Sequence, residues 1–499
     1  MQKKHVIFAT IVALGLVLRL YGGTNSVLFT YDQARDAIYA QNILSGHLKI
    51  VGPPTDIPGF FHGPLYLYLI TPFYYLSGGY PNFVLLELVL INLATLIPIF
   101  FLTQKLFKND TISLISILLF ATSFEAVSYA RWISNPAPAI LALALVYLGL
   151  WIVIEREKLG WILLAVGSGV AIQVQSFLLY LIPFIIFCLL VYRVKIKPKS
   201  YVIFSVVILL FLTASYALAD IKFHFQGSKH LLEYLLSSLN SGSVKGPNIT
   251  SYQKHISALF SANLFYNSKL ASNILALVIF FTSIKLIWQK IDKKPLIFNL
   301  LIFFSGLTVF LFSKFNAQFL TIGSTVPFIV LSSYVLHKFT VISKKLGYLL
   351  IALIVALNVY TTLAKNKQGN VLFQIQDGMK FGDEMKLVKR TYDISGNDKF
   401  SINAVTAPLF VPTKWAYLYE IYAKKYHKEK PFFHGDSDPT SVGYDILSRS
   451  GEATKNEFTI VEPGLPDFWV KKAVQADDKR KPQKHTENVG IFKLIVRRD

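Results

Sequence analysis

Long apolar runs, separated by short polar segments, fill most of the first 363 residues of the chain. Each run has roughly 17 to 23 residues, the length that an α-helix needs to cross the hydrocarbon core of a bilayer. The pattern therefore predicts about eleven transmembrane helices. We place them at residues 6–22, 83–105, 111–129, 137–154, 160–176, 177–193, 201–219, 271–288, 296–313, 318–337 and 346–363.

Basic residues fall in every second connection between these runs. The connections in question contain, among others, Lys108, Arg156, Lys195, Lys293 and Lys344. Cytoplasmic loops of membrane proteins carry an excess of Lys and Arg, so these connections are predicted to lie in the cytoplasm. The chain is then an integral protein of the cell membrane, with a cytoplasmic N-terminus and an extracytoplasmic C-terminal part.

This orientation requires that residues 62–80 do not form a complete span. Their sequence, HGPLYLYLITPFYYLSGGY, has Pro or Gly at both ends and in the middle, and it contains five tyrosines. Tyrosine is enriched at the membrane–water interface, and Pro and Gly interrupt helices. We therefore assign the segment to a first outer loop with interfacial helices at residues 23–82. A second long outer loop is predicted at residues 220–270.

The last part of the chain, residues 364–499, is mixed in charge and much less apolar. Residues 400–405, 457–461 and 489–496 have the pattern of strands, and residues 415–426 have that of a helix. This alternation predicts a small soluble α/β domain. The domain organisation is thus a transmembrane domain at 1–363 followed by an extracytoplasmic domain at 364–499.

Composition narrows the class of protein. The chain is 53% hydrophobic and 14% aromatic, which is unlike a soluble enzyme. Its net charge of +21 could indicate nucleic acid binding, but the bases occur in short clusters between apolar runs. We therefore assign the charge to topology and expect membrane lipids, not nucleic acid, as partners. The single cysteine, Cys188, excludes a disulfide framework. No P-loop, dinucleotide fingerprint or HExxH motif is present, which disfavours a nucleotide-driven pump and a zinc protease.

The first outer loop concentrates polar chemistry in residues 30–64. Thr30 followed three residues later by Gln33 predicts a capping box at the start of a helix. This helix would carry Asp32, Arg35 and Asp36 on one face, together with Tyr39, while its apolar residues lie elsewhere and rest at the membrane surface. Arg35 between two acids one turn apart would offset their repulsion. The alternative is that both acids simply decorate a helix start.

Further polar residues recur at the outer ends of predicted spans. Arg131 and Asn135 occur in ARWISNPAP, and Lys314 and Gln318 occur in SKFNAQF. Charges so close to hydrocarbon are costly, which makes these residues candidates for binding an anion at the membrane boundary. For Arg131 an anion ligand and a structural charge are equally good interpretations, whereas for Lys314 an ordinary loop charge is favoured. Arg19, at the end of the first run, is expected to snorkel to lipid headgroups.

The segments YDQARDA and FFHGPLY, in this order, resemble the polytopic lipid-dependent glycosyltransferases of the GT-C fold. These include protein O-mannosyltransferases and the bacterial aminoarabinose transferase. The resemblance implies that Asp32 is the catalytic aspartate and that His62 replaces the usual lysine near the donor phosphate. It also implies that Lys314 and Gln318 correspond to a stretch beside a later span. Gln33 stands where glutamate is common and Gln318 where a base is common, which leaves the donor type and any metal open.

The chemistry of such a transfer suits these residues. A sugar on a polyprenyl phosphate already has a good leaving group, so one carboxylate suffices as general base and cations stabilise the phosphate. Asp32 is assigned as the base. Arg35, His62, Arg131, Lys314 and Gln318 are assigned to the donor phosphate, and Asp36, Tyr39 and Asn135 to orientation or the acceptor. No cofactor is certain, and Asp36 could help to hold a divalent cation.

The leading hypothesis is therefore transfer of a single sugar from a polyprenyl-phosphate donor to a lipid, glycan or protein acceptor outside the cytoplasm. A lipid or solute transporter is one alternative, although it should carry ionisable residues at the bilayer midplane instead of at the ends of spans. A polysaccharide polymerase or ligase that uses a diphosphate-linked oligosaccharide is another, and would be expected to carry arginines in a large late loop.

Overall fold

The computed structural model describes residues 2–240, 249–312, 317–373 and 376–498. The chain divides into two compact units. The helical unit comprises Met1–Tyr21, Lys49–Tyr66 and Leu86–Lys365. The sheet unit comprises Gly22–Leu48, Leu67–Leu85 and Asn366–Asp499. Two segments of the predicted first outer loop thus belong with the C-terminal part of the chain, whereas the sequence pattern had grouped the whole loop with the membrane domain.

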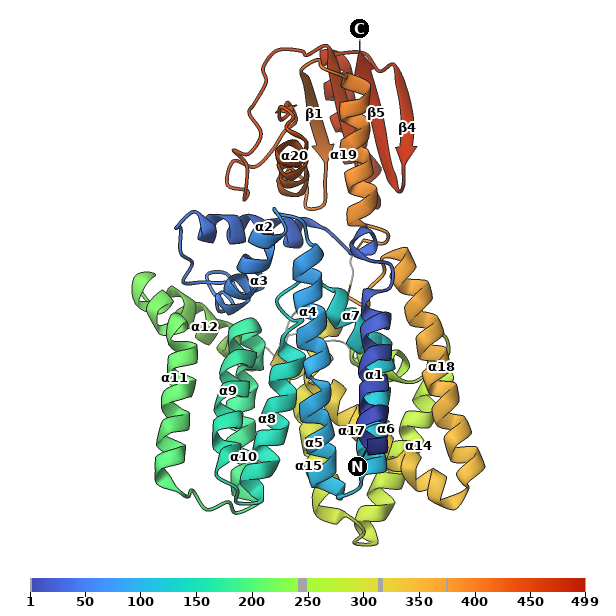
Figure 1. The fold of residues 1–499 in the computed structure, drawn as a ribbon. Coiled ribbons are helices and arrows are strands. Elements are labelled where there is room, and N and C mark those ends of the chain that lie inside the picture. The colour runs from blue at the N-terminus through green and yellow to red at the C-terminus, as the bar shows by residue number, and fades with distance from the viewer. Residues whose placement is uncertain (1, 241–248, 313–316, 374–375, 499) are drawn as a thin grey trace. The chain divides into compact units, whose positions relative to one another are not determined.

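The helical unit is a bundle of helices that run side by side (Figure 1). All eleven apolar runs predicted from the sequence form helices or pairs of helices in the described residues. Side-chain caps begin several of them: Asn109 accepts from two backbone N–H groups at the start of α6, and Ser123 and Ser268 cap α7 and α14. The elements, including α4 and α18, which extend past the unit's boundary, are α1 (Gln2–Leu20), α4 (Asn82–Ala94), α5 (Leu96–Phe107), α6 (Asp110–Thr122), α7 (Phe124–Arg131), α8 (Ala139–Ile154), α9 (Leu159–Val174), η2 (Ser176–Tyr180), α10 (Leu181–Val191), α11 (Lys199–Lys222), α12 (Gln226–Asn240), α13 (Ile249–Asn263), α14 (Lys269–Trp288), α15 (Lys293–Leu307), α16 (Val309–Phe312), η3 (Gln318–Thr321), α17 (Ile322–Ile342) and α18 (Lys344–Gln368).

Five helices in the described residues are long and apolar enough to cross a membrane, or six if the bent pair α6–α7 forms one span. The other apolar helices are shorter, so the predicted total of eleven crossings stays a prediction. Helix α11 shows that the unit requires lipid around it: its side chains are exposed, with Phe211 at 79%, Ile203 at 63% and Leu210 at 63%. Exposed apolar surface of this extent marks contact with a membrane. In contrast, α17 is buried nearly all round.

Helix α3 (Leu65–Leu76) has 12 residues and contains Pro72. At 1.5 Å per residue it is roughly 18 Å long, well short of a bilayer core of about 30 Å. This length agrees with the prediction that residues 62–80 do not form a complete span.

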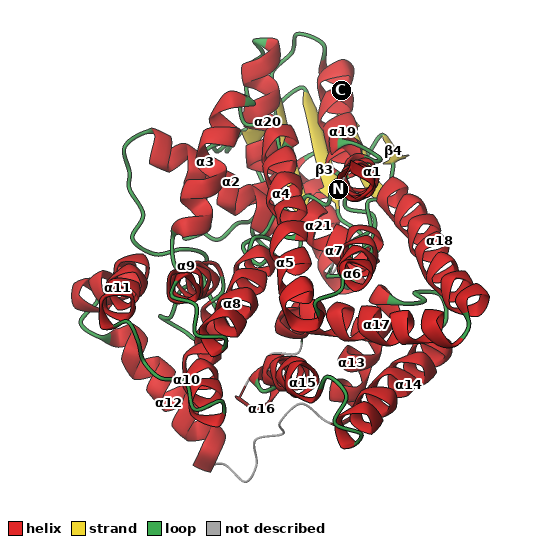
Figure 2. Ribbon diagram, turned by 60° about the horizontal axis from the view of Figure 1, so that its bottom comes forward, coloured by secondary structure: helices red, strands yellow, loops and turns green. Residues whose placement is uncertain are grey.

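The sheet unit contains five strands in the order β2-β1-β3-β5-β4. Strand β1 pairs in parallel with β2 and β3, whereas β5 pairs antiparallel with β3 and β4. Figure 2 shows that the strands gather in one place and that helices flank them. The elements are η1 (Thr24–Ser26), α2 (Tyr31–Leu44), α3, α19 (Phe381–Ser395), β1 (Phe400–Val405), α20 (Thr413–Tyr426), β2 (Phe432–Phe433), β3 (Asn456–Val461), α21 (Asp467–Arg480), β4 (His485–Val489) and β5 (Phe492–Arg498). The predicted strands at 400–405 and 457–461 and the predicted helix at 415–426 are therefore confirmed, whereas the strand predicted at 489–496 covers the end of β4, a turn and most of β5.

Helix α2 is held inside the sheet unit by backbone and ring contacts. The Phe29 N–H donates to the Met379 carbonyl at 3.0 Å, and the Phe381 N–H donates to the Val27 carbonyl at 2.9 Å. The Phe29 ring stacks on Tyr417 with centroids 6.0 Å apart, and α2 packs against α20. The prediction that the apolar face of this helix rests on lipid headgroups was therefore wrong: Ala34, Ala37 and Ile38 are buried.

Candidate functional site

The start of α2 organises the acidic part of the candidate site. The capping box predicted from the sequence is present, and the Thr30 N–H donates to Gln33 Oε1 at 2.9 Å. The cap fixes the first turn, on which Asp32 lies at the positive end of the helix dipole. The side chain of Asp32 is 50% exposed, whereas that of Asp36, one turn later, is fully buried. One carboxylate thus meets solvent and the other does not.

Arg35 joins the two carboxylates. Its Nη1 donates to Asp32 Oδ1 at 2.7 Å, and its Nε and Nη2 donate to Asp36 Oδ1 at 2.9 and 2.8 Å. The guanidinium also lies over the Tyr31 ring, 5.6 Å from its centroid. Two-point hydrogen bonding to Asp36 fixes the orientation of the guanidinium, and the guanidinium in turn fixes Asp32. The predicted placement of Arg35 between the two acids is confirmed.

Burial controls the protonation of Asp36. Burial raises the pKa of this carboxyl to about 6, with Arg35 acting in the opposite direction and the charge of Asp32 adding to the rise. Asp36 Oδ2 is buried and, within the described residues, has no hydrogen-bond partner, which suits an oxygen that carries a proton. Burial also lowers the pKa of Arg35, but Asp36 and then Asp32 more than offset this and raise it above its usual value. Burial raises the pKa of the Tyr39 phenol.

We expect Asp36 to titrate at about pH 6, well above the ordinary aspartate value of about 4. Infrared difference spectra recorded across this range should show the C=O band of a protonated carboxyl growing as the pH falls, and Asp36→Asn should remove that band. Asp32→Asn should lower the midpoint, because the negative charge of Asp32 favours the protonated form of its neighbour. A midpoint near 4 in the wild-type protein would contradict the assigned environment.

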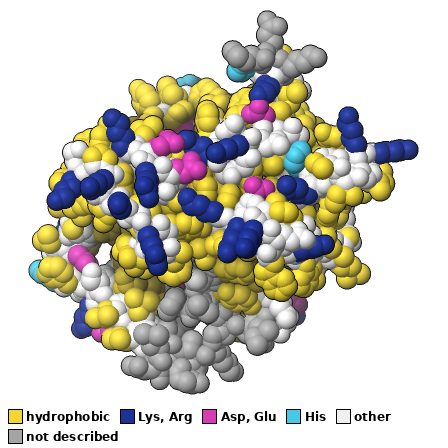
Figure 3. Space-filling view, turned by 90° about the horizontal axis from the view of Figure 1, so that it is seen from below, with side chains coloured by type: hydrophobic (Ala, Val, Ile, Leu, Met, Phe, Trp, Pro, Cys, Tyr) yellow, Lys and Arg dark blue, Asp and Glu magenta, His cyan; other side chains and the backbone are white. Residues whose placement is uncertain are grey.

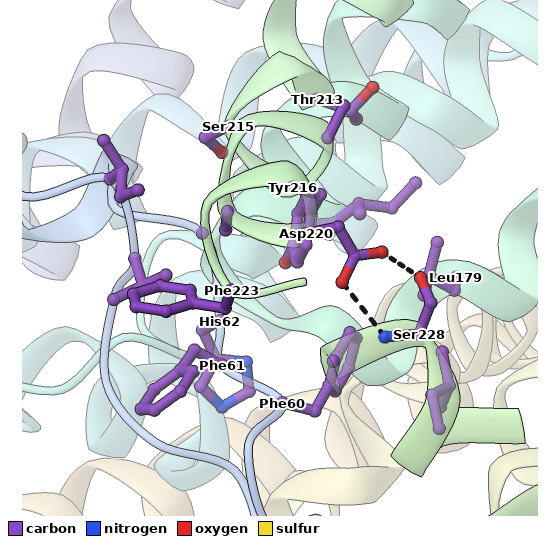
Figure 4. A pocket seen from close by; sticks show the side chains of 18 of the residues that line it. Phe60, Phe61, His62, Leu179, Thr213, Ser215, Tyr216, Asp220, Phe223 and Ser228 are labelled. Carbon is purple, nitrogen blue, oxygen red and sulfur yellow. Dashed lines mark hydrogen bonds between the residues drawn. The ribbon is translucent and has the colours of Figure 1, made fainter. Parts of the chain in front are cut away.

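His62 lies in the helical unit, in a cavity with a volume of about 480 Å³ (Figure 4). Three separate stretches of chain build its wall, and apolar side chains such as Phe60, Leu179 and Leu210 predominate in the lining. The polar groups that reach it include Tyr216 and Asp220. This is the composition of a pocket for a largely apolar ligand with a few oriented polar groups.

Hydrogen bonds fix the His62 ring. Its Nδ1 accepts from the Ser176 backbone N–H at 3.0 Å and lies 3.1 Å from the Ser176 hydroxyl. A nitrogen that accepts from an N–H carries no proton, so in the neutral ring the proton is on Nε2. The neighbouring Gly63 packs closely against Gln173: a Cβ at residue 63 would come within 2.1 Å of Gln173 Oε1. Only glycine allows so close an approach.

Asp220 closes another part of the cavity wall. Its carboxylate accepts from the Ser228 backbone N–H at 3.1 Å and from the Ser228 hydroxyl, as Figure 4 shows. These bonds tie the end of α11 to the start of α12. The sequence singled out neither residue, because the cavity assembles from segments that are far apart in the chain and no local motif marks them.

Arg131, Asn135 and Gln318 also lie in the helical unit, and each makes a buried contact. Arg131 Nη1 donates to the Arg19 carbonyl at 2.8 Å, and Asn135 Nδ2 donates to the Val174 carbonyl at 2.8 Å. Gln318 Nε2 donates to the His255 carbonyl at 3.1 Å. Asn135 and His62 therefore both form hydrogen bonds to the short turn between α9 and η2.

The structure does not describe every predicted site residue. Lys314 lies outside the described residues. Within the residues that are described, no group of three or more His, Cys, Asp or Glu side chains could hold a metal ion.

Arg19 is a residue that the sequence analysis misjudged. It does not snorkel: its side chain is fully buried, its Nε donates to Asn92 Oδ1 at 2.8 Å, and its Nη1 donates to the Ala121 carbonyl at 2.8 Å. A signal was available, because an amide such as Asn92 inside an apolar span requires a hydrogen-bonding partner. The Arg19 backbone carbonyl is also the acceptor for Arg131, so the two arginines belong to one polar network.

Known structures share this architecture. The chain matches ArnT from Cupriavidus metallidurans bound to undecaprenyl phosphate with a TM-score of 0.62 and 9% identity, covering 98% of this chain and 97% of that one. The apo form of the same protein matches with a TM-score of 0.64 and 10% identity over the same shares. The chain has the GT-C fold. The GT-C resemblance noted in YDQARDA and FFHGPLY is thus confirmed.

Two further comparisons match only part of the chain. The family model for dolichyl-phosphate-mannose-protein mannosyltransferase matches residues 61–216, which begin one residue before His62 and end at Tyr216 of the cavity. A partial structural match, to the S. cerevisiae Pmt1–Pmt2 complex bound to the sugar donor, has a TM-score of 0.33 and 16% identity over 45% of this chain and 34% of that one. A search of curated protein sequences gives no significant match.

Proposed function

We propose that the chain is an integral-membrane glycosyltransferase that moves a single sugar from a polyprenyl-phosphate donor to an acceptor on the extracytoplasmic face. The observation that carries the proposal is the apolar cavity around His62 in a protein of the GT-C fold. The similar protein ArnT was crystallised with undecaprenyl phosphate. Like the proposed donor, this lipid combines a long apolar chain with an anionic head. A cavity with apolar walls and an imidazole suits such a ligand.

His62 is the proposed contact for the donor phosphate. In the neutral ring, the proton on Nε2 makes this nitrogen a hydrogen-bond donor. Such a donor stabilises a phosphate oxygen as the sugar leaves. Arg35, Arg131, Lys314 and Gln318 are proposed as further phosphate ligands, and Asn135 as the residue that orients the turn contacting His62.

Asp32 is the proposed general base. The acceptor hydroxyl oxygen attacks the anomeric carbon, the bond from that carbon to the phosphate oxygen breaks with its electron pair leaving on the phosphate, and the hydroxyl proton moves to Asp32. A half-exposed carboxylate that Arg35 holds in place can receive this proton. The phosphate departs as a stable anion, so the paired acid that a glycosidase requires is unnecessary. Asp36 and Tyr39 are proposed to orient Arg35 and the acceptor.

The proposed topology has eleven membrane crossings, with the N-terminus in the cytoplasm and the domain from residue 364 onward outside. Figure 3 shows an end face of the molecule on which Lys and Arg side chains are scattered among hydrophobic ones. The connections α8–α9 and α10–α11 contain basic residues, as at Arg156 and Lys195, and α18 begins with Lys344. A basic face bordering an apolar bundle supports a cytoplasmic assignment for these loops.

The test is to incubate membranes that contain the protein, and that also supply acceptors, with a panel of radiolabelled polyprenyl-phosphate sugars and with a polyprenyl-diphosphate oligosaccharide. We expect one monophosphate sugar to be consumed, with release of the free polyprenyl phosphate. Consumption of the diphosphate donor alone would identify a polymerase or ligase instead. Movement of an intact donor across the bilayer, without bond cleavage, would identify a transporter.

A matched pair of variants assigns the donor site in the same assay. His62→Ala should weaken donor binding about tenfold or more, because a phosphate contact is lost, whereas His62→Lys should retain much of it. His47→Ala is the control, since His47 is an exposed histidine elsewhere in the first loop. Equal donor affinity in His62→Ala and wild-type protein would remove His62 from the donor site.

A further inference from the structure

The sheet unit contains a second hollow, here called the lysine groove. It has a volume of about 770 Å³. Its wall includes Lys386 and Lys389 from α19 and Lys424 and Lys425 from α20, with Tyr80 and Tyr426 between them. Of the described residues that line it, none is acidic. Four ammonium groups around one hollow create a positive potential that attracts anions.

Two of the four lysines form no ion pair within the described residues, although the charge of Lys424 acts on the nearby Glu420 carboxyl. Lys386 pairs with Asp383 at 2.9 Å and Lys389 pairs with Asp393 at 2.7 Å. Lys425 instead lies over the Tyr80 ring, 4.3 Å from its centroid, and no ion pair involves Lys424 or Lys425 in the described part of the chain. An ammonium over a ring face keeps its full charge and its hydrogen-bonding capacity. The α20 side of the groove is therefore available to a ligand anion.

Aromatic rings supply the second recognition element. Tyr422 and Tyr426 lie with ring centroids 4.6 Å apart, and Tyr426 is 50% exposed. The C–H faces of a sugar ring pack on such exposed rings, and the phenol hydroxyls can bond to sugar hydroxyls. Exposed lysines alone would attract any anion. Lysines and tyrosines that line the same groove favour a ligand with both negative groups and sugar rings.

The groove is shaped by the core of the unit. Gly382, at the start of α19, lies so close to η1 that a Cβ would come within 2.7 Å of the Asn25 carbonyl oxygen. Phe381 packs edge-on against Tyr80 at 5.8 Å, which fixes the loop that precedes α4 to the same helix. Helix α19 also packs against α20, where the Tyr392 ring stacks on Tyr422 with centroids 5.0 Å apart. The positions of the two lysine-bearing helices are therefore determined by packing, so the groove is preformed.

We propose that the lysine groove binds an anionic glycan, with carboxylate or phosphate groups on Lys424 and Lys425 and a sugar ring on Tyr426. Identifying this glycan as the acceptor rests on the proposed function, whereas the binding itself does not. An anionic lipid headgroup offers similar charges but lacks a chain of sugar rings long enough to follow the groove.

The experiment measures binding by calorimetry with the full chain in detergent micelles, in the absence of donor. The probes are tetragalacturonate, which has four carboxylates, the neutral maltotetraose, and phosphatidylcholine vesicles containing phosphatidylglycerol. The test variant is Lys424→Gln with Lys425→Gln. The control variant is Lys471→Gln with Lys484→Gln, two exposed lysines of the same unit outside the groove. Thermal unfolding is recorded for each variant to verify folding.

Tetragalacturonate is expected to bind more tightly than maltotetraose, and the test variant should lose about tenfold or more in affinity while the control variant loses little. Tyr426→Ala should weaken binding without changing its salt dependence, because it removes a ring and no charge. Equal losses in test and control variants would overturn the proposal, as would equal binding of both oligosaccharides. Binding to the vesicles alone, dependent on Lys424 and Lys425, would overturn it in favour of a lipid site. The titration is repeated with Asp32→Asn, which should bind tetragalacturonate like the wild-type protein. Glycan binding is thereby tested independently of the proposed catalytic function.

Discussion

Asp32→Asn is expected to lower kcat by about 10²- to 10⁴-fold, the range contributed by a general base. Asparagine has the same shape as aspartate, and its side-chain oxygen can still accept from Arg35, so the first turn of α2 should persist. It cannot accept the proton of an attacking hydroxyl. The measurement is single-turnover kinetics with the donor that the panel identifies, together with donor affinity measured separately.

The matched control for Asp32→Asn is a second exposed aspartate of the first loop. Asp56→Asn removes another exposed carboxylate of the first loop and should leave kcat nearly unchanged. Donor affinity should be similar in both variants, because Asp32 is proposed to act on the acceptor proton and not on the phosphate. Wild-type turnover in Asp32→Asn would remove Asp32 from its proposed role.

Arg35→Leu is expected to destabilise the packing of α2 in the sheet unit by about 1–3 kcal/mol near neutral pH, because the buried Asp36 carboxyl loses its hydrogen-bond donor and must take up a proton to avoid an unpaired charge. Asp36 is fully buried, and Arg35 supplies both a hydrogen bond and the ion pair to its Oδ1. Hydrogen exchange of the α2 amides reports the free energy of local opening. Since a neutral Asp36 requires no cation, the loss should be smaller at pH 5.

Two further variants distinguish this mechanism from a simple loss of packing. Arg390→Leu removes a largely exposed ion pair with Glu487 in the same unit, and such pairs contribute only about 0–1 kcal/mol. The double variant Arg35→Leu with Asp36→Leu should recover much of the stability, because no charge is left buried. If the double variant opens as readily as Arg35→Leu alone, the buried carboxylate is not the cause.

Local features of this chain could be predicted because short-range physics determines them. The capping box of Thr30 and Gln33 marks the start of α2, and the spacing of Asp32, Arg35 and Asp36 along a helix is enough to bring their side chains together. The apolar runs form helices because nothing else satisfies their backbone in lipid. Strand β1 follows from the alternation of apolar Phe400 and Ile402 with polar Ser401 and Asn403.

Features that depend on distant parts of the chain could not be predicted in this way. The sequence gives no sign that Phe29 pairs with Met379, so α2 was expected at a lipid surface and not against α20. The cavity around His62 combines residues from near position 50 to near position 230, and no single segment identifies it. Arg19 was expected to reach headgroups because its hydrogen-bonding partner, Asn92, lies in another helix.

The backbone pairing of Phe29 with Met379 and of Phe381 with Val27 has a consequence for biosynthesis. The chain emerges from the ribosome in order, so α2 is translated long before α20, and all the intervening helices must be inserted first. The carboxylates of α2 therefore reach their final environment only after the last segment has been made. A truncated product that ends before Asn366 lacks Met379 and α20. Asp32 would then not reach its final environment, even if the membrane helices had inserted correctly.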